Sequence, residues 1–231
     1  ILYLQDLNVD NRYSTKYEVY KIKVDDILKI DILSESPEAS LIFNQKGLNP
    51  NTSNNKESLV FEGYQVNSQG RVSIPSIGSI YVKGKTIDEI RDIIYKKIVE
   101  SGKLIDPNID VKLLNSYFTV LGEVQNPGKH DFLENNLNIL EAIGIAGDLT
   151  INGKRNDIKI IRETGGNNVV ISIDLTKTEF LSSNKYQIFS GDIIIVNPNT
   201  TRIKNAGIIG NSGTLLSLLS FILSSIIVIS N

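Results

Sequence analysis

The sequence predicts an α+β fold in two domains, followed by one membrane-spanning helix. Short stretches in which apolar and polar residues alternate indicate β-strands in both domains. Thr86 with Glu89, and Asn138 with Glu141, match the pattern in which two side chains cap the start of a helix reciprocally. In addition, no Asp, Glu, Lys or Arg occurs from residue 205 to residue 231.

The C-terminal segment, assigned to residues 201–231 and uncharged from residue 205 onward, is long enough to cross a bilayer. A helix over residues 206–230 would be roughly 37 Å long at about 1.5 Å per residue, against a hydrocarbon core of about 30 Å. Small residues recur at steps of three and four, which predicts one helix face that meets neighbouring helices or a pore lumen. These residues are Ala206, Gly210, Gly213, Ser217, Ser220 and Ser224. The alternative is a buried hairpin or core helix of a soluble domain.

Residues 1–16 are expected to form an extended arm, and residues 17–116 the first domain. A long loop rich in Asn is expected over residues 34–56, and a helix from Thr86 carries isoleucines at helical spacing. Gly70 is expected to supply the positive φ of a hairpin between the strands that flank it. The expected strands are Tyr17–Val24, paired with the next strand, and residues 27–32, 59–67, 71–74, 80–82 and 109–113.

Residues 117–200 are expected to form the second domain. Gly122, Pro127 and Gly128 are expected to shape a turn after its first strand, because Pro presets φ and Gly accepts the left-handed region. The helix from Asn138 lies between strands, and two strands, a helix across them and further strands describe a β-grasp-like unit. The expected strands are residues 117–124, 129–132, 158–161, 169–173 and 192–196.

The composition argues against several classes of function. A net charge of −2 without a basic block argues against a nucleic-acid partner. The lack of Cys excludes thiolate catalysis and cysteine zinc sites, and His130 is the only histidine. The glycine before Gly84 is Gly78, one position too distant for a phosphate-binding loop. We therefore expect no enzymatic activity, no cofactor and no metal.

Several motifs occur in an order that resembles a known family. The run from Tyr20 to Ile32 resembles the start of the polysaccharide biosynthesis/export domain, with Asp25 where that family mostly has Gly. Further similar motifs of that domain lie at residues 66–78, 84–89 and 106–107. Motifs that resemble the SLBB (soluble-ligand-binding β-grasp) domain lie at residues 120–128, 140–142, 146–147 and 191–192.

This resemblance implies an outer-membrane polysaccharide export protein of the Wza type, for capsule or exopolysaccharide. Its implied assembly is a ring-shaped homo-oligomer with a periplasmic body, whose C-terminal helices line a porin-like channel. The implied partners are further copies of the chain, the exported polysaccharide, an inner-membrane polysaccharide co-polymerase and outer-membrane lipid. Because the sequence begins with Ile1, we also expect a removed secretion signal. The resemblance further implies a lipoprotein, whose lipid anchor would lie at a Cys that precedes residue 1.

Two alternatives remain open. A single-pass membrane-anchored module of the cell envelope could hold a glycan with its SLBB-like unit and use the helix only as an anchor. A cell-envelope enzyme is the third interpretation, and no residue in the sequence can be named for its chemistry.

Overall fold

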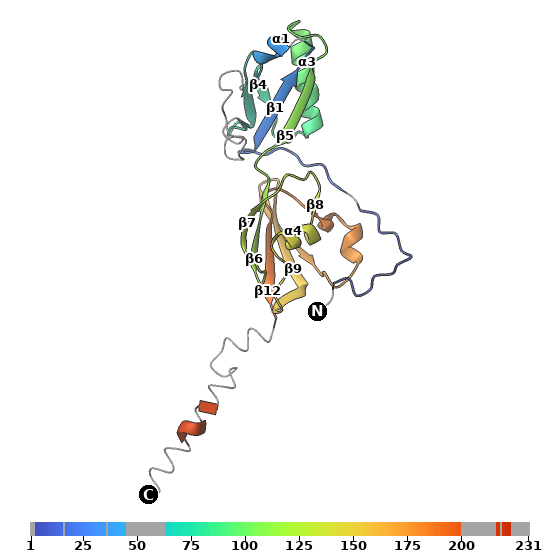
Figure 1. Ribbon diagram of the computed structural model, residues 1–231, viewed down its shortest axis with the longest axis vertical. Coiled ribbons are helices and arrows are strands. Elements are labelled where there is room, and N and C mark those ends of the chain that lie inside the picture. The colour runs from blue at the N-terminus through green and yellow to red at the C-terminus, as the bar shows by residue number, and fades with distance from the viewer. Residues whose placement is uncertain are drawn as a thin grey trace. The chain divides into compact units, whose positions relative to one another are not determined.

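A computed structural model describes residues 3–15, 17–35, 37–44, 63–199, 216–217 and 219–222. The chain folds into two compact units (Figure 1). The first unit comprises residues 17–117 and 131–136, and the second comprises residues 1–16, 118–130 and 137–231. The N-terminal arm thus belongs to the second unit, although the first unit follows it directly in the sequence.

The first unit is built around β1, the central strand of a three-stranded antiparallel sheet. β1 lies between β2 and β5, and its alternating residues Leu28, Ile30 and Ile32 are buried in the core. A separate two-stranded sheet consists of β3 and β4. The elements are β1 (Ile27–Leu33), α1 (Pro37–Leu41), β2 (Tyr64–Gln65), β3 (Arg71–Ile74), β4 (Gly78–Tyr81), α3 (Ile87–Glu100) and β5 (Asn108–Leu113).

The predicted capping box begins helix α3. The Thr86 hydroxyl accepts the backbone N–H of Glu89 at 3.2 Å, and the Glu89 carboxylate accepts the backbone N–H of Thr86 at 2.7 Å. Two amide donors that have no partner within the helix are thereby satisfied. Ile90, Ile94 and Ile98 form the buried face of the helix, and α3 packs against β5.

The predicted strand Tyr17–Val24 is wrong. Its described residues have no strand assignment, and Ile22 instead exchanges two backbone hydrogen bonds with the loop at Gly84 and Lys85. The predicted pairing of this segment with β1 is also wrong, because β2 and β5 occupy both edges of β1. Alternation of apolar residues therefore indicated an extended segment correctly but not its partner.

The predicted hairpin around Gly70 has a different partner strand. Gly70 has the expected positive φ of 75°, in a turn where its N–H donates to the carbonyl of Asn67 at 2.8 Å. β3 pairs, however, with β4 through the turn at Pro75, and β2 pairs with β1. The expected long loop contains helix α1 in its described part, and residues 45–62 lie outside the described residues.

The second unit contains a five-stranded mixed sheet in the order β10-β9-β12-β6-β7. β12 runs parallel to β6 and antiparallel to β9, and β10 runs antiparallel to β9 (Figure 1). A mixed sheet with one α-helix fits the predicted α+β class. The elements are β6 (Tyr117–Gly122), β7 (Gly128–Asp131), β8 (Leu137–Asn138), α4 (Ile139–Ile145), β9 (Gly153–Thr164), β10 (Asn167–Ile173), the 3-10 helices η2 (Glu179–Ser182) and η3 (Asn184–Tyr186), β11 (Gln187–Ile188) and β12 (Ile193–Pro198).

Helix α4 also begins with its predicted capping box. The Asn138 side chain accepts the N–H groups of Leu140 and Glu141, and the Glu141 carboxylate accepts the N–H of Asn138 at 2.9 Å. Gly147 follows the helix with a φ of 78°, the left-handed conformation common after a helix end. The sequence patterns therefore predicted the starts of both α3 and α4 correctly.

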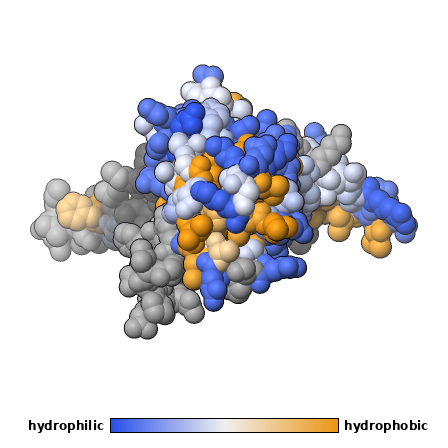
Figure 2. All heavy atoms as spheres, turned by 90° about the horizontal axis from the view of Figure 1, so that it is seen from above, coloured by the Kyte–Doolittle hydropathy of each residue, from blue (hydrophilic) through white to orange (hydrophobic). Residues whose placement is uncertain are grey.

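The first unit exposes large apolar side chains around three loops that contact one another. The Ser76 hydroxyl donates to the carbonyl of Ile42, and the Lys103 ammonium donates to the carbonyl of Ser76. Apolar areas lie between hydrophilic ones on the face turned to the viewer in Figure 2. The exposed apolar residues near these loops are Leu33, Leu41, Ile42 and Ile105.

Candidate functional site

The predicted small-residue face of the C-terminal segment lies mostly outside the described residues. Ala206, Gly210, Gly213 and Ser224 are not among them. Ser217 and Ser220 are helical and exposed, and the Ser220 hydroxyl donates to the Ser217 carbonyl at 2.9 Å. Within the part of the chain that the structure describes, no helix is long and apolar enough to cross a membrane.

Gly122 lies where two parallel strands approach each other closely. It ends β6 opposite Val196 of β12, with a φ of 95°, and the next amide, that of Glu123, donates to the Val196 carbonyl at 3.1 Å. A Cβ atom on Gly122 would lie 2.1 Å from the Val196 oxygen. Only glycine can therefore occupy this position without displacing β12.

The turn that contains Pro127 and Gly128 is more open. Pro127 is exposed, and a Cβ atom on Gly128, which has a φ of 142°, would have no neighbour within 4 Å. The preceding residues are bound to the segment after α4, since the N–H of Gln125 donates to the Asp148 carbonyl and the N–H of Asn126 donates to the Ala146 carbonyl. The three predicted turn residues thus share one loop, and only Gly122 is closely packed in it.

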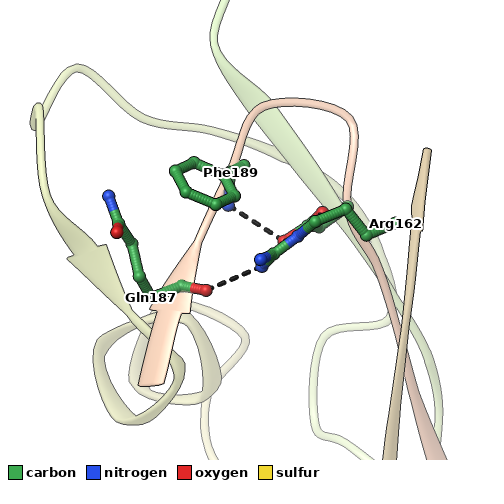
Figure 3. Close-up of polar contacts among 4 residues, drawn as sticks. Arg162, Gln187 and Phe189 are labelled. Carbon is green, nitrogen blue, oxygen red and sulfur yellow. Dashed lines mark hydrogen bonds and ion pairs between the residues drawn. The ribbon is translucent and has the colours of Figure 1, made fainter. Parts of the chain in front are cut away.

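A buried ion pair holds the loop before β12. Asp192, of which 1% is exposed, accepts three hydrogen bonds from the Arg162 guanidinium, at 2.9, 3.2 and 2.6 Å. Arg162 also donates to the Gln187 carbonyl at 2.7 Å (Figure 3), and its guanidinium lies 4.3 Å from the centre of the Phe189 ring. The N–H of Phe189 donates to Asp192 at 2.9 Å. Both charges are held by several hydrogen bonds, so the cluster attaches the loop to β9.

Sequence reasoning identified Asp192 as part of a motif but did not identify Arg162. The signal was present in the alternation of β9, where Ile158 and Ile160 are inward-facing and Arg162 occupies the next inward position. A charged residue at an inward position requires a buried partner. The carboxylate of Asp192, one strand away, is that partner.

Asp26 in the first unit is a second buried carboxylate, and its hydrogen bonds come from a backbone amide and a tyrosine hydroxyl. It accepts the N–H of Lys23 at 2.8 Å and the hydroxyl of Tyr20 at 3.1 Å. Burial raises the pKa of Asp26 above its usual value, and these two hydrogen bonds oppose the rise. Asp25, the residue before it, has a φ of 68°.

The N-terminal arm is held on the second unit by several polar contacts. The Asp6 carboxylate accepts the N–H of Thr178 at 2.7 Å and also its hydroxyl, and the backbone N–H of Leu4 donates to the Leu175 carbonyl at 3.0 Å. The expectation of an extended arm is wrong in part, because Leu4 has a φ of 48° and turns follow it. Polar residues such as Asn8, which accepts the N–H of Asp10, favour these turns.

The segment between α4 and β9 contacts both the arm and the end of β12. The Tyr3 hydroxyl donates to Asp148, and the Arg155 guanidinium lies 5.0 Å from the Tyr3 ring centre. Burial and the neighbouring carboxylate raise the pKa of Tyr3 to about 12. The N–H of Asn199 donates to the Asn152 carbonyl at 2.6 Å. One segment therefore fixes the arm and the start of the C-terminal region together.

Among the described residues, no group of three or more His, Cys, Asp or Glu side chains could hold a metal ion. The polar clusters described above hold turns and chain ends in position. Two small α+β units, each with a capped helix, define a modular protein built from two successive domains.

Two family models match these modules. The family of polysaccharide biosynthesis/export proteins matches residues 14–114, and the SLBB domain matches residues 117–172. The chain therefore carries a polysaccharide biosynthesis/export domain followed by an SLBB domain, as the sequence motifs predicted.

Three curated proteins show similarity over parts of the chain. The EPS I polysaccharide export outer membrane protein EpsA of Ralstonia solanacearum is 29% identical over 200 residues, which are 83% of this chain and 51% of EpsA. EpsA of Ralstonia nicotianae is 30% identical over 58% of this chain and 35% of its own. The exopolysaccharide production protein ExoF of Rhizobium meliloti is 33% identical over 42% of this chain and 24% of its own.

The chain spans about half the length, or less, of these curated relatives. The family that matches residues 14–114 and EpsA are both named for polysaccharide export, which agrees with the prediction that the chain is not an enzyme.

Proposed function

We propose that this protein is a subunit of an outer-membrane translocon that exports a capsular polysaccharide or exopolysaccharide. Copies of the chain form a closed ring with a periplasmic body, and their C-terminal helices together line the outer-membrane pore. The observation that carries this proposal is the order of the modules. An export domain precedes an SLBB domain, and a segment without charged residues follows both.

Assembly of several copies follows from the physics of the pore. One spanning helix cannot enclose a hydrated polymer, because the wall of a pore needs satisfied backbone groups on every side and a polar lumen. In the described part of the C-terminal helix, the Ser220 hydroxyl is satisfied by its own helix. Serine hydroxyls can in general both donate and accept hydrogen bonds, as a polar lumen requires of the side chains that line it. The Leu219 and Phe221 side chains suit lipid.

The second unit supports a fixed connection to the membrane. β12 ends at Pro198, which is paired with Gly153, and Asn199 is bound to the adjacent backbone. The arm is bound to the same segment through Tyr3. A lipid anchor at a Cys before residue 1 and the C-terminal helix would then both be directed from this segment to outer-membrane lipid.

The remaining partners are the polymer and a protein of the inner membrane. The polysaccharide passes along the ring axis by exclusion and weak polar contacts. An inner-membrane polysaccharide co-polymerase contacts the first unit, whose exposed apolar side chains, such as Ile105 with 91% exposure, offer a surface for a protein partner.

The competing function is a membrane-anchored glycan-binding module. In that case the SLBB domain holds a glycan, and the helix serves only as an anchor. The two functions differ in whether substitutions on one face of the C-terminal helix abolish export while substitutions on the other face do not.

The decisive experiment compares two double variants of the C-terminal helix. Ser217→Leu with Ser220→Leu keeps the segment apolar enough to insert, but its bulk prevents close helix contact or narrows the lumen. Leu218→Ala with Leu219→Ala is the matched control, because at about 100° per residue these two positions are centred on the side of a helix opposite Ser217 and Ser220. The measurement is polysaccharide at the cell surface, at equal amounts of protein in the outer membrane.

We expect the serine pair to abolish most export and the leucine pair to retain most of it. Equal tolerance of both pairs would contradict the pore and support the anchored module, because an isolated helix has no privileged face.

A further inference from the structure

The strand β10 forms one edge of the five-stranded sheet in the second unit. It is bonded to β9 on one side only, over residues 167–173. Within the described residues, no backbone group of another segment pairs with its outer side, since the arm reaches only Leu175 and Thr176 beyond its end. Val169 is 46% exposed and Val170 is 61% exposed. These two neighbours point to opposite faces of the strand, so both faces are accessible.

β10 lacks the features that usually protect an edge strand. Natural edges carry charged side chains or Pro, which prevent pairing with another chain. The edge strand β5 of the first unit follows this rule, with Asp110 and Lys112 forming an exposed ion pair. The seven residues of β10, Asn-Asn-Val-Val-Ile-Ser-Ile, include no charge and no Pro. An accessible, uncharged edge of this length is a template for a further strand.

We propose that β10 pairs with the sheet of a second copy of this chain, at the opposite edge formed by β7. This inference rests on the proposed ring and specifies its contact between neighbours. A single sheet with two different edges can continue head to tail from copy to copy, and such a contact gives a ring where the rotation between copies closes. Pairing of β10 with itself would instead end at a dimer. β10 itself brings no charge into the contact, and the charged residues of β7, Lys129 and Asp131, have side chains that point to a face of the sheet and not along its edge.

The first test places a charge on β10 in the full-length chain. Val170→Lys adds a side chain that remains solvated in the single copy but would be brought against the neighbouring strand in the ring. Val99→Lys on α3 is the matched control, because Val99 is also exposed, at 41%, and lies on a helix in the other unit. The measurement is the mass of the detergent-extracted protein by light scattering, with circular dichroism to verify folding.

We expect Val170→Lys to convert the large oligomer to smaller species and Val99→Lys to leave it intact. If Val170→Lys misfolds, Val169→Lys provides the same charge from the opposite face. If the folded β10 variants form an oligomer of the same mass as the wild type, the β10 contact is overturned and the proposed ring still stands. A monomeric wild type would overturn the ring itself.

The second test identifies the strand that faces β10. The chain contains no Cys, so introduced cysteines react without background. Val170→Cys combined with Lys129→Cys, treated with a short bismaleimide, should give a ladder of linked chains up to the full ring, whereas each single variant should give none. A dimer from Val170→Cys alone would show that β10 pairs with itself, and it would overturn the head-to-tail contact.

Discussion

Asp26 in the first unit and Asp192 in the second close similar turns, but Asp26 accepts a hydrogen bond from the Tyr20 hydroxyl, whereas Asp192 forms a buried ion pair with Arg162. Each follows a residue with positive φ, Asp25 at 68° and Gly191 at 89°. Each carboxylate accepts the backbone N–H of the residue three positions earlier, at 2.8 Å for Asp26 and 2.9 Å for Asp192. The local turn is therefore the same, while the compensation of the buried charge differs.

The difference shows that the buried carboxylate of the same turn can be stabilised in two ways. In the second unit, Arg162 joins the turn to β9, so the turn is part of a contact between distant segments. In the first unit, Tyr20 supplies only a neutral hydroxyl, and the buried charge raises the pKa of Asp26. The second unit should therefore be sensitive to the loss of one partner, and the first should be sensitive to pH.

The largest effect is expected from Arg162→Met, which leaves Asp192 buried without its cation. Loss of one partner of a buried pair costs about 3–5 kcal/mol of unfolding free energy. Urea denaturation measures this loss, and Arg91→Met is the control because Arg91 forms an exposed pair with Asp88, worth at most about 0.5 kcal/mol. Equal losses in the two variants would show that Arg162 is not essential to the second unit.

The second prediction compares two glycine variants of the second unit, one limited by steric crowding and the other by backbone strain alone. Gly122→Ala should cost about 3 kcal/mol, because its Cβ atom would meet the Val196 oxygen in addition to requiring positive φ. Gly128→Ala should cost about 1 kcal/mol from backbone strain alone, since the space around it is open. Thermal unfolding of both variants measures the difference. A greater loss for Gly128→Ala would contradict the close approach of β6 and β12.

Asp26→Asn tests the pH dependence of the first unit. Because the pKa of Asp26 is raised in the folded state, the folded chain binds this proton more readily than the unfolded chain. The associated stability is fully present below the unfolded pKa, near 3.8, and is lost as pH rises through the folded pKa. Asn retains an acceptor for Lys23 and Tyr20 but does not ionise.

Urea denaturation from pH 4 to pH 8 should therefore show the variant gaining stability relative to wild type as pH rises. Asp110→Asn, in an exposed ion pair, is the control and should show no such gain. A constant difference between Asp26→Asn and wild type across this range would contradict the raised pKa.

The smallest effect is expected from Asp25→Gly, which makes the first turn resemble the second. Gly relieves about 1–2 kcal/mol of left-handed strain, while its greater freedom in the unfolded chain removes up to about 1 kcal/mol. The net gain should be about 0.5 kcal/mol in denaturant unfolding. The pKa of Asp26 should also fall, since the negative charge of Asp25 contributes to its rise. A net loss of stability would show that the Asp25 side chain stabilises the turn.

Local signals in the sequence predicted the helices correctly and the strand partners poorly. The capping boxes at Thr86 and Asn138 each lie within four residues, so the sequence contains the whole interaction. The partner of β1 is β5, about eighty residues later, and alternation of apolar residues does not encode that choice. Tyr17–Val24 was consequently assigned to the wrong partner.

The candidate site was predictable to a similar extent. Gly122 was identified as a turn residue from its motif, but its contact with Val196 depends on a parallel pairing between distant strands. The attachment of the arm depends on Asp6 and Thr178, 172 positions apart, and neither residue has a local signal for it. Arg162 could have been found, because a charge at an inward strand position demands a partner.

The central claim is that copies of this chain assemble into a closed ring that forms the export pore. Native mass spectrometry of the full-length protein, extracted from membranes in mild detergent, tests it most directly. The account predicts one dominant species whose mass is a single integer multiple of the chain mass, greater than two. A monomer or dimer as the dominant species, at concentrations where the membrane form exports polysaccharide, would contradict it.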